Sequence, residues 1–427
     1  MQKRYKILII LVFITITYGY GQSFLNSPYT RFGLGQLNQS GFSQNRALGG
    51  ITAGYRTTNS INFLNPASYT AIDTLSFIFD VGFQGGWLAV ESNAGSNTTK
   101  MAYFDHLAMM FPITRWWSTS IGIAPFSRTG YELLGSASDT SFNFVYSGNG
   151  GISQFFIGNS LRIGRHIALG FNFSYLFGPI ERSATIGLDN DSYGAVTVFD
   201  YKAYLGNIYF DYGIQFFTTI KEKHTLVVGS VFSNKTDLKC SYSKLITRIQ
   251  DFSGIDTLEY SGRMKGSVLF PMKWGIGFTY KYNNQLTLGF DYHTQDWSKA
   301  IFPEMFGQQE PMASSSYYRA GLEFTPVPLT KVKRVNYLAR INYRIGGVYE
   351  KTNLNINNNQ IFSYGMSFGV GIPWRNERKL LTNTSFNLTY EFRVRGTIDN
   401  SLIKETYNMV TMGLVLHDFW FIKPKYD

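Results

Sequence analysis

Most of the chain beyond residue 75 alternates between large apolar side chains and small, polar or charged ones. One clear example is the series Phe171, Phe173, Tyr175 and Phe177, which alternates with Gly170, Asn172, Ser174 and Leu176. A period of two residues is typical of a β-strand with one apolar face. The runs are about 10–16 residues long, which suits strands that cross a bilayer at a tilt, whereas strands of soluble sandwiches average about 5–6 residues.

We expect fourteen such strands. The alternating runs lie near residues 75–91, 101–113, 117–127, 152–163, 166–178, 202–219, 224–235, 272–282, 285–298, 315–326, 335–349, 360–372, 380–396 and 405–418. Tight turns follow the second, fourth, sixth and eighth runs, and long segments lie at 128–151, 179–201, 236–271 and 299–314. Outer-membrane barrels have short periplasmic turns and long external loops. The pattern therefore predicts an all-β fold, a transmembrane antiparallel β-barrel of about 14 strands over residues 75–427, with its apolar face toward lipid.

The first residues read as a secretory signal over residues 1–21. Lys3, Arg4 and Lys6 precede an apolar stretch at 7–16 that is too short to anchor in a bilayer. Small residues at Gly19 and Gly21 predict cleavage before Gln22. We therefore expect an exported protein of the bacterial outer membrane.

Composition and charge narrow the choice of partners. Charged residues make up only 16% of the chain, aromatic residues 17%, and the net charge is +11. An exported chain with scattered Lys and Arg meets anionic membrane surfaces rather than nucleic acid, so outer-membrane lipids and lipopolysaccharide are the expected partners. The single cysteine, Cys240, excludes an intramolecular disulfide framework and a cysteine-based zinc site.

Residues 22–74 do not alternate and are rich in Gly, Asn, Ser and Thr. A segment of this kind before a barrel can hang in the periplasm or fold into the lumen as a plug. A barrel of fourteen strands has a lumen wider than its own side chains fill. We expect an N-terminal periplasmic or hatch segment that seals this lumen.

The hatch segment also carries a family resemblance. The series Ala47-Leu48-Gly49-Gly50, followed by Asn59-Ser60-Ile61-Asn62-Phe63-Leu64-Asn65-Pro66-Ala67, resembles the hatch signature of the FadL-type long-chain fatty-acid transporters. The resemblance implies a fourteen-stranded barrel that takes up hydrophobic molecules by passive diffusion through a plugged lumen. It also implies a sideways exit at a kink in the third strand. Asn65, Pro66 and Ala67 are then hatch or gating residues, although an Asn-Pro turn that enters the first strand is the alternative.

Pro125 lies within the third predicted strand. Proline removes a hydrogen-bond donor from the strand ladder and belongs at edges or bulges. Pro125 therefore predicts a local break in the wall, and it is our candidate for the gating position. The alternative is a position near the external rim, where pairing ends in any case.

A fatty-acid carboxylate would need a cation in the lumen, because a desolvated charge is costly when unpaired. By alternation, Arg340, Arg344, Arg393 and Arg395 point inward and outnumber the acids near them. They are the candidate ligand-binding residues. The alternative is that these arginines pair with acids across the lumen or with the plug.

Signals for an enzyme are weak. Gly365, Ser367 and Gly369 fit the spacing of a nucleophile elbow, but that elbow requires a turn from strand to helix, and here the series lies inside an alternating strand. The five histidines are dispersed without metal-ligand spacing. We expect no enzyme activity, no cofactor and no metal.

Two functions follow from the resemblance. The first is uptake of a hydrophobic ligand, such as a long-chain fatty acid, with exit near the third strand. The second is a non-transporting barrel of the same fold, because some FadL-like barrels act as structural or partner subunits in protein secretion and surface attachment of the type IX kind. The long segments at 179–201 and 236–271 could dock such a partner.

Overall fold

The structure is a computed structural model that describes residues 26–136, 142–188, 196–250, 254–303, 312–327, 336–374 and 384–419. The strands that build the wall are β2 (Ser76–Ser92), β3 (Gly95–Pro112), β4 (Trp117–Ser136), β5 (Phe142–Ile163), β6 (Ile167–Leu188), β7 (Val196–Ile220), β8 (His224–Ser233), β9 (Thr236–Gln250), β10 (Gly254–Phe270), β11 (Lys273–Tyr282), β12 (Leu286–Asp296), β13 (Ser314–Phe324), β14 (Asn342–Ile356), β15 (Asn359–Pro373), β16 (Ser385–Arg395) and β17 (Lys404–Phe419). Short elements precede the wall: η1 (Pro28–Arg31), β1 (Gln36–Leu37), α2 (Ser43–Ala47) and η2 (Pro66–Ala71). Three more short helices lie between strands: η3 (Trp297–Lys299), η5 (Tyr337–Arg340) and η6 (Asp399–Ser401).

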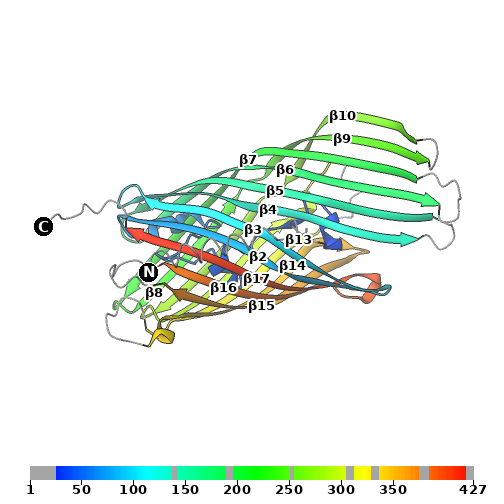
Figure 1. The fold of residues 1–427 in the computed structure, drawn as a ribbon. Coiled ribbons are helices and arrows are strands. Elements are labelled where there is room, and N and C mark those ends of the chain that lie inside the picture. The colour runs from blue at the N-terminus through cyan, green and yellow to red at the C-terminus, as the bar shows by residue number, and fades with distance from the viewer. Residues whose placement is uncertain are drawn as a thin grey trace, which may run out of the picture.

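The wall is a closed antiparallel barrel (Figure 1). The last strand, β17, pairs with the first, β2, along its whole length, from Lys404 opposite Glu91 to Phe419 opposite Ser76. Strands β8 and β9 both pair with β7 and together form one interrupted strand of the wall. Strands β11 and β10, which pair with β8 and β9 respectively, form a second interrupted strand. In the described part of the chain, the sixteen strands from β2 to β17 thus give fourteen positions around the barrel, as predicted.

Outward and inward side chains alternate as the sequence predicts. On β6, Phe171 and Phe173 are exposed on the outer surface, while Asn172 and Ser174 between them are buried. Large exposed apolar side chains recur on the other wall strands, among them Trp274, Ile276 and Phe278 on β11, Leu288 and Phe290 on β12, and Tyr390 and Phe392 on β16. This apolar belt is the surface that a barrel presents to hydrocarbon. No helix in the described ranges is long and apolar enough to cross a membrane.

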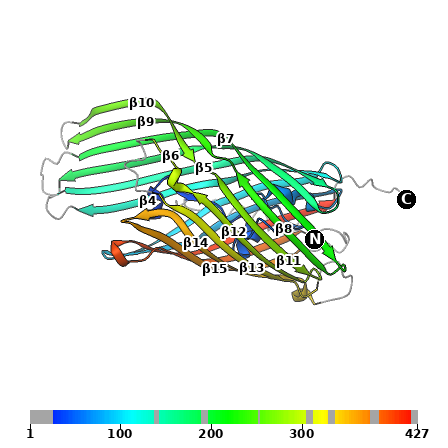
Figure 2. The same cartoon turned by 180° about the vertical axis from the view of Figure 1, so that it is seen from behind.

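Three segments predicted as long loops are largely strand, which corrects the sequence reading. Residues 128–151 and 179–201 extend β4, β5, β6 and β7, and residues 236–271 form β9 and β10. These extensions rise above the rest of the barrel on one side only, as Figures 1 and 2 show. We call residues 128–136 of β4, 142–151 of β5, 179–188 of β6 and 196–201 of β7, together with β9 and β10, the crest. Most crest residues of β10 are exposed on both faces, so no apolar alternation marked them as strand.

The end of the barrel opposite the crest carries tight turns. Asn283 and Asn284 both have positive φ, of 52° and 53°, and join β11 to β12. Asparagine is favoured in such two-residue turns because it tolerates the left-handed region. By the rule for outer-membrane barrels, this end faces the periplasm and the crest faces outward. The predicted strand over 335–349 begins only at Asn342, after η5.

The described residues before β2 lie inside the barrel, where Figure 2 shows them in blue between the strands. Helix α2 contacts β14 to β17, and η2 contacts β4 to β7, so the segment touches opposite parts of the wall. Phe42, Ile61 and Phe63 pack against Phe156 of β5 and Val415 of β17. The lumen at this level is therefore filled by chain rather than by open water.

The apolar belt yields a test. Phe173→Arg places a charge in the hydrocarbon and should destabilise the assembled barrel by about 2–4 kcal/mol. Urea titration of the protein folded in liposomes, followed by the shift of the folded band in unheated gel electrophoresis, measures this. Leu134→Arg on the crest is the control and should leave stability within about 0.5 kcal/mol. Equal losses for the two variants would contradict a lipid-facing position of Phe173.

Candidate functional site

The wall has one seam, in the described ranges, where two neighbouring strands part. Strands β3 and β4 pair from Pro112 opposite Ser118 only as far as Leu107 opposite Ile123. Beyond that point β3 and β4 no longer pair with each other: β3 remains paired with β2 and β4 with β5, and both strands continue for many residues. We call the two facing edges, residues 95–106 of β3 and 124–136 of β4, the seam.

Pro125 lies at the start of this seam. Pairing of β3 with β4 ends two residues before it, and the β4–β5 ladder shifts register between Pro125 and Ser127. Proline has no N–H to offer a neighbouring strand, so it terminates a ladder at low cost. The end of β3–β4 pairing therefore lies two residues from Pro125.

The freed edge of β4 is covered by residues 26–40, which we call the strap. Its strand β1 pairs antiparallel with β4, with Gln36 opposite Arg128 and Leu37 opposite Ser127. Further backbone hydrogen bonds on this edge run from Asn38 N to Phe126 O (2.9 Å) and from Ser27 N to Gly130 O (2.7 Å). The strap therefore supplies the hydrogen-bond partners that β3 does not, as buried backbone groups require.

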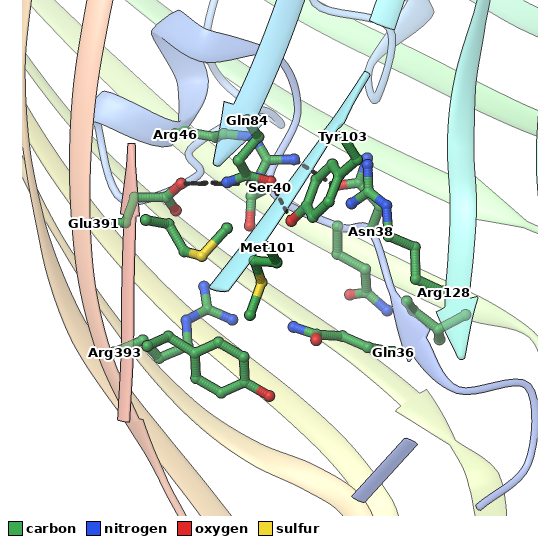
Figure 3. A pocket seen from close by; sticks show the side chains of 14 residues that line it. Gln36, Asn38, Ser40, Arg46, Gln84, Met101, Tyr103, Arg128, Glu391 and Arg393 are labelled. Carbon is green, nitrogen blue, oxygen red and sulfur yellow. Dashed lines mark hydrogen bonds and ion pairs between the residues drawn. The ribbon is translucent and has the colours of Figure 1, made fainter. Parts of the chain in front are cut away.

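A cavity of about 70 Å³ lies beside the strap (Figure 3). Its lining combines Met101 of β3 and Met409 of β17 with Arg128 and Arg393. A second cavity, of about 40 Å³, is lined by Arg319, Arg393, Arg395 and Glu350, together with strap residues. Arg393 thus lines both cavities, and so do strap residues such as Gln36 and Leu37. The lining offers apolar surface and positive charge at one place.

A buried charge network holds the N-terminal segment to the wall below the seam. Arg46 of α2 lies 3.1 Å from a carboxylate oxygen of Asp105 and 3.7 Å from one of Glu391. Burial alone would lower the pKa of Arg46, but these two carboxylates raise its pKa above the ordinary value. Since a buried charge is tolerated only when it is paired, the network fixes α2 against β3 and β16.

His106 extends this network. Its Nδ1 lies 2.9 Å from Asp105 and its Nε2 lies 2.9 Å from Asp80, so both ring nitrogens face carboxylates. The ring of Phe42 stacks on it with a centroid distance of 3.7 Å. Asp105 and His106 are neighbours in sequence, yet both are buried, because the register shift between Gly82 and Phe83 leaves Asp105 without a directly opposed partner.

The Asn65-Pro66-Ala67 series lies deeper in the lumen. Asn65 caps η2, its side chain accepting a hydrogen bond from Ala67 N (3.1 Å) and donating one to Ala53 O (2.6 Å). Pro66 occupies the first helical turn, where its missing N–H is not needed. The motif sits against wall glycines: a Cβ on Gly170 would meet Pro66 and Ala67, and one on Gly213 would meet the Asn65 side chain. Small wall residues therefore let the motif approach the barrel backbone.

The four predicted arginines occupy different levels. Arg344 lies deep in the lumen with its guanidinium 2.6 Å from Glu323 and 2.9 Å from Asn387. Arg393 lies 3.7 Å from Glu350, and Arg395 lies 3.7 Å from Glu405. Arg340 lies outside the strands, in η5 at the tight-turn end. The structure thus brings Arg393 and Arg395 together at the cavities and keeps Arg340 and Arg344 apart from them.

Ser367 of the elbow-like series bridges wall and hatch. Its hydroxyl donates to Ala47 O (3.1 Å) and accepts from Gly49 N (3.1 Å). These contacts give it a structural role at the N-terminal segment.

Sequence reasoning missed Asp80, Asp105, His106 and Arg128 as members of this site. Strict alternation assigns only one of Asp105 and His106 to the lumen, and a bulge is not visible in hydropathy. Arg46 stands out in the sequence as an isolated charge in a neutral segment, which was the one available signal.

Comparison with solved structures finds the same fold in two proteins described as toluene transporters and in a FadL homologue. The toluene transporter TodX of Pseudomonas putida has 14% identity and a TM-score of 0.57, covering 90% of this chain and 100% of that chain. The toluene transporter TbuX of Ralstonia pickettii has 13% identity and a TM-score of 0.52 (90% and 99%). A FadL homologue of Pseudomonas aeruginosa has 11% identity and a TM-score of 0.52 (90% and 98%).

At these identities the likeness concerns the fold, and it confirms the FadL-type barrel expected from the sequence. No curated protein matches the sequence. The family model described as BamG matches residues 1–427, the whole chain. The protein is therefore a member of the BamG family, built on a FadL-type barrel.

Proposed function

We propose that this protein takes up hydrophobic small molecules, such as long-chain fatty acids, by passive diffusion and releases them sideways through the seam. The observation that carries the proposal is the end of β3–β4 pairing at Leu107 and Ile123, while both strands continue outward. A gap between wall strands is the one route by which an apolar molecule reaches hydrocarbon without crossing water. The protein would act in the bacterial outer membrane, after removal of residues 1–21.

The strap is the gate in this proposal. It is joined to the β4 edge by backbone hydrogen bonds, each worth about 0.5–1.5 kcal/mol, and it is not one of the fourteen strand positions of the wall. Side-chain hydrogen bonds from Ser27 to Glu405 and from Tyr29 to Ile403 O also hold it, so its movement must break these contacts. The cavity beside it, of about 70 Å³, is smaller than the pockets of about 300–1,000 Å³ that bury typical ligands. A ligand therefore enters only as the strap moves and the flexible side chains of Met101 and Met409 rearrange.

The deeper part of the N-terminal segment acts as the fixed hatch. Asn65, Pro66 and Ala67 rest on the wall, and an Asp291 carboxylate oxygen accepts hydrogen bonds from Thr52 N (2.5 Å) and Ala53 N (2.7 Å). These contacts favour a hatch that stays seated while the strap above it opens. The lumen then remains sealed to water and ions during uptake.

The cations at the cavities suit a ligand with an apolar body and an anionic head. Arg393 has a carboxylate neighbour only at 3.7 Å and lines both cavities, so it is the first candidate to meet a ligand carboxylate. Arg395 lies beside the second cavity. Arg344 and Arg340, nearer the tight-turn end, would be met only by a ligand that passes the hatch.

Locking the strap tests the gate. In the variant Leu37→Cys with Ser127→Cys, the two residues are directly opposed, and oxidation should fix the strap to β4. Uptake of fluorescent fatty acid into proteoliposomes should fall at least tenfold on oxidation and recover on reduction. The control pair Met110→Cys with Ser120→Cys lies where β3 and β4 are already paired. Undiminished uptake through the locked strap would contradict the gate.

Removing one charge tests the ligand class. Arg393→Gln should raise the half-saturating concentration for fatty-acid uptake about tenfold, because a charge-assisted hydrogen bond contributes about 1.5–3 kcal/mol. Uptake of toluene, which has no charge, should be unaffected. Lys265→Gln on the crest is the matched control. If toluene and fatty acid respond equally to Arg393→Gln, this arginine does not recognise a carboxylate.

A second candidate function rests on the crest. This part of the sheet exposes large apolar side chains well above the lipid belt, among them Leu134, which is 77% exposed, and Tyr260, which is 69% exposed. Such residues suit a protein partner, as in the role of a structural subunit for secretion or surface attachment.

A photo-crosslinking residue at position 260 should then capture one partner protein in intact cells, and the same residue at position 173 in the lipid belt should not. Lipid adducts at both positions would argue against the partner role.

A further inference from the structure

Exposed cations gather on three successive turns at the tight-turn end. They are Arg115 between β3 and β4, Arg162 and Arg165 around the β5–β6 turn, and Lys221 and Lys223 between β7 and β8. All five side chains are exposed, and Glu222 is the one acid on these turns. The uptake route described above uses none of them.

Backbone hydrogen bonds tie these turns into a continuous border, which we call the basic rim. Arg162 N donates to Trp116 O (2.7 Å) across the first two turns. Phe217 N, on β7, donates to His166 O (2.8 Å), and Asn283 N donates to Lys223 O (2.6 Å). The cations are thus fixed at one level along the barrel edge rather than carried on independent loops.

The cations of the basic rim have no close carboxylate partner among the described residues. Some lysines elsewhere lie within 4 Å of a carboxylate, in the pairs Lys202 with Glu181, Lys244 with Glu259, Lys299 with Asp296, and Lys404 with Glu91, whereas Lys100, Lys239 and Lys265 are single exposed lysines without such a pair in the described ranges. Within the described ranges, no such pair involves a cation of the basic rim. The rim is distinct because five such cations lie together on one edge of the barrel, without a carboxylate within 4 Å in the described part of the chain.

The rim lies directly at the border of the apolar belt. Trp116, which is 54% exposed, and the exposed Ile163 and Ile220 are chain neighbours of the rim cations. Tryptophan is typical of the membrane–water interface, and long Lys and Arg side chains extend from apolar surface toward the headgroups. The rim charges therefore sit at the depth of lipid phosphates.

We infer that the basic rim binds the phosphate headgroups of anionic phospholipids in the leaflet at the tight-turn end. Cations without a close carboxylate in the described ranges, tight turns that keep them level with the apolar belt, and the neighbouring tryptophan all fit a lipid surface. An acidic protein would more naturally meet cations on a protruding or concave surface. Each Lys or Arg near such a surface contributes about a fivefold gain in affinity.

Native mass spectrometry of the full detergent-solubilised protein tests the inference. With equal phosphatidylglycerol and phosphatidylcholine added, the wild type should retain at least fivefold more of the anionic lipid. The variant R115Q/R162Q/R165Q/K221Q/K223Q should bring this ratio close to one. The matched variant K100Q/K202Q/K239Q/K265Q/K299Q removes the same charge from five exposed lysines away from the rim and should keep the preference.

An unchanged ratio in the rim variant, or equal losses in the two variants, would overturn the inference. Complete displacement of phosphatidylglycerol by an equal concentration of inorganic phosphate would show that the rim binds free phosphate and would overturn it as well. If the variant with five substitutions does not fold, the variant R162Q/R165Q and a salt titration of the wild type replace it. The wild-type preference must then fall with rising salt, because exposed charges are screened, and a salt-independent preference counts against the rim.

Discussion

Hydrocarbon offers no partner to a backbone amide or carbonyl, so a chain that crosses it as β-strands must pair every strand on both sides. The fourteen positions of this barrel meet that requirement almost everywhere, down to the pairing of β17 with β2. The seam between β3 and β4 is where the requirement is met by other means. There the strap, which is not a wall strand, completes the ladder along β4.

The same constraint explains what surrounds the seam. A strap that replaces wall must be held in register, and the segment that follows it is anchored by charge. Arg46 spans from α2 to Asp105 of β3 and Glu391 of β16, and His106 links Asp105 onward to Asp80 of β2. Removing one partner of a buried ion pair typically costs about 3–5 kcal/mol, so this network anchors α2 firmly.

The barrel could be predicted because lipid imposes a two-residue period on every strand that touches it. Phe171 and Phe173 must point outward, and Asn172 between them must not, so the strand can be predicted from the sequence. The crest strands do not follow this two-residue period. Residues of β10 such as Ile255 and Glu259 are exposed together, and a strand without a buried face leaves no alternation to detect.

Only part of the candidate site could be predicted from the sequence. Pro125 marked the break because the missing donor of proline is a property of the residue itself. The Asp105–His106 pair was hidden, because a bulge changes which side a residue faces without changing the sequence pattern. The pairing of β1 with β4 joins two segments about 90 residues apart, and neither Gln36 nor Leu37 carries a local sequence signal for it.

The position of α2 also constrains how the molecule can be made. This helix, near the start of the chain, contacts β14 to β17, which are synthesised last. These contacts can form only when the last strands are in place. The N-terminal segment therefore completes its packing late, together with the closure of β17 onto β2.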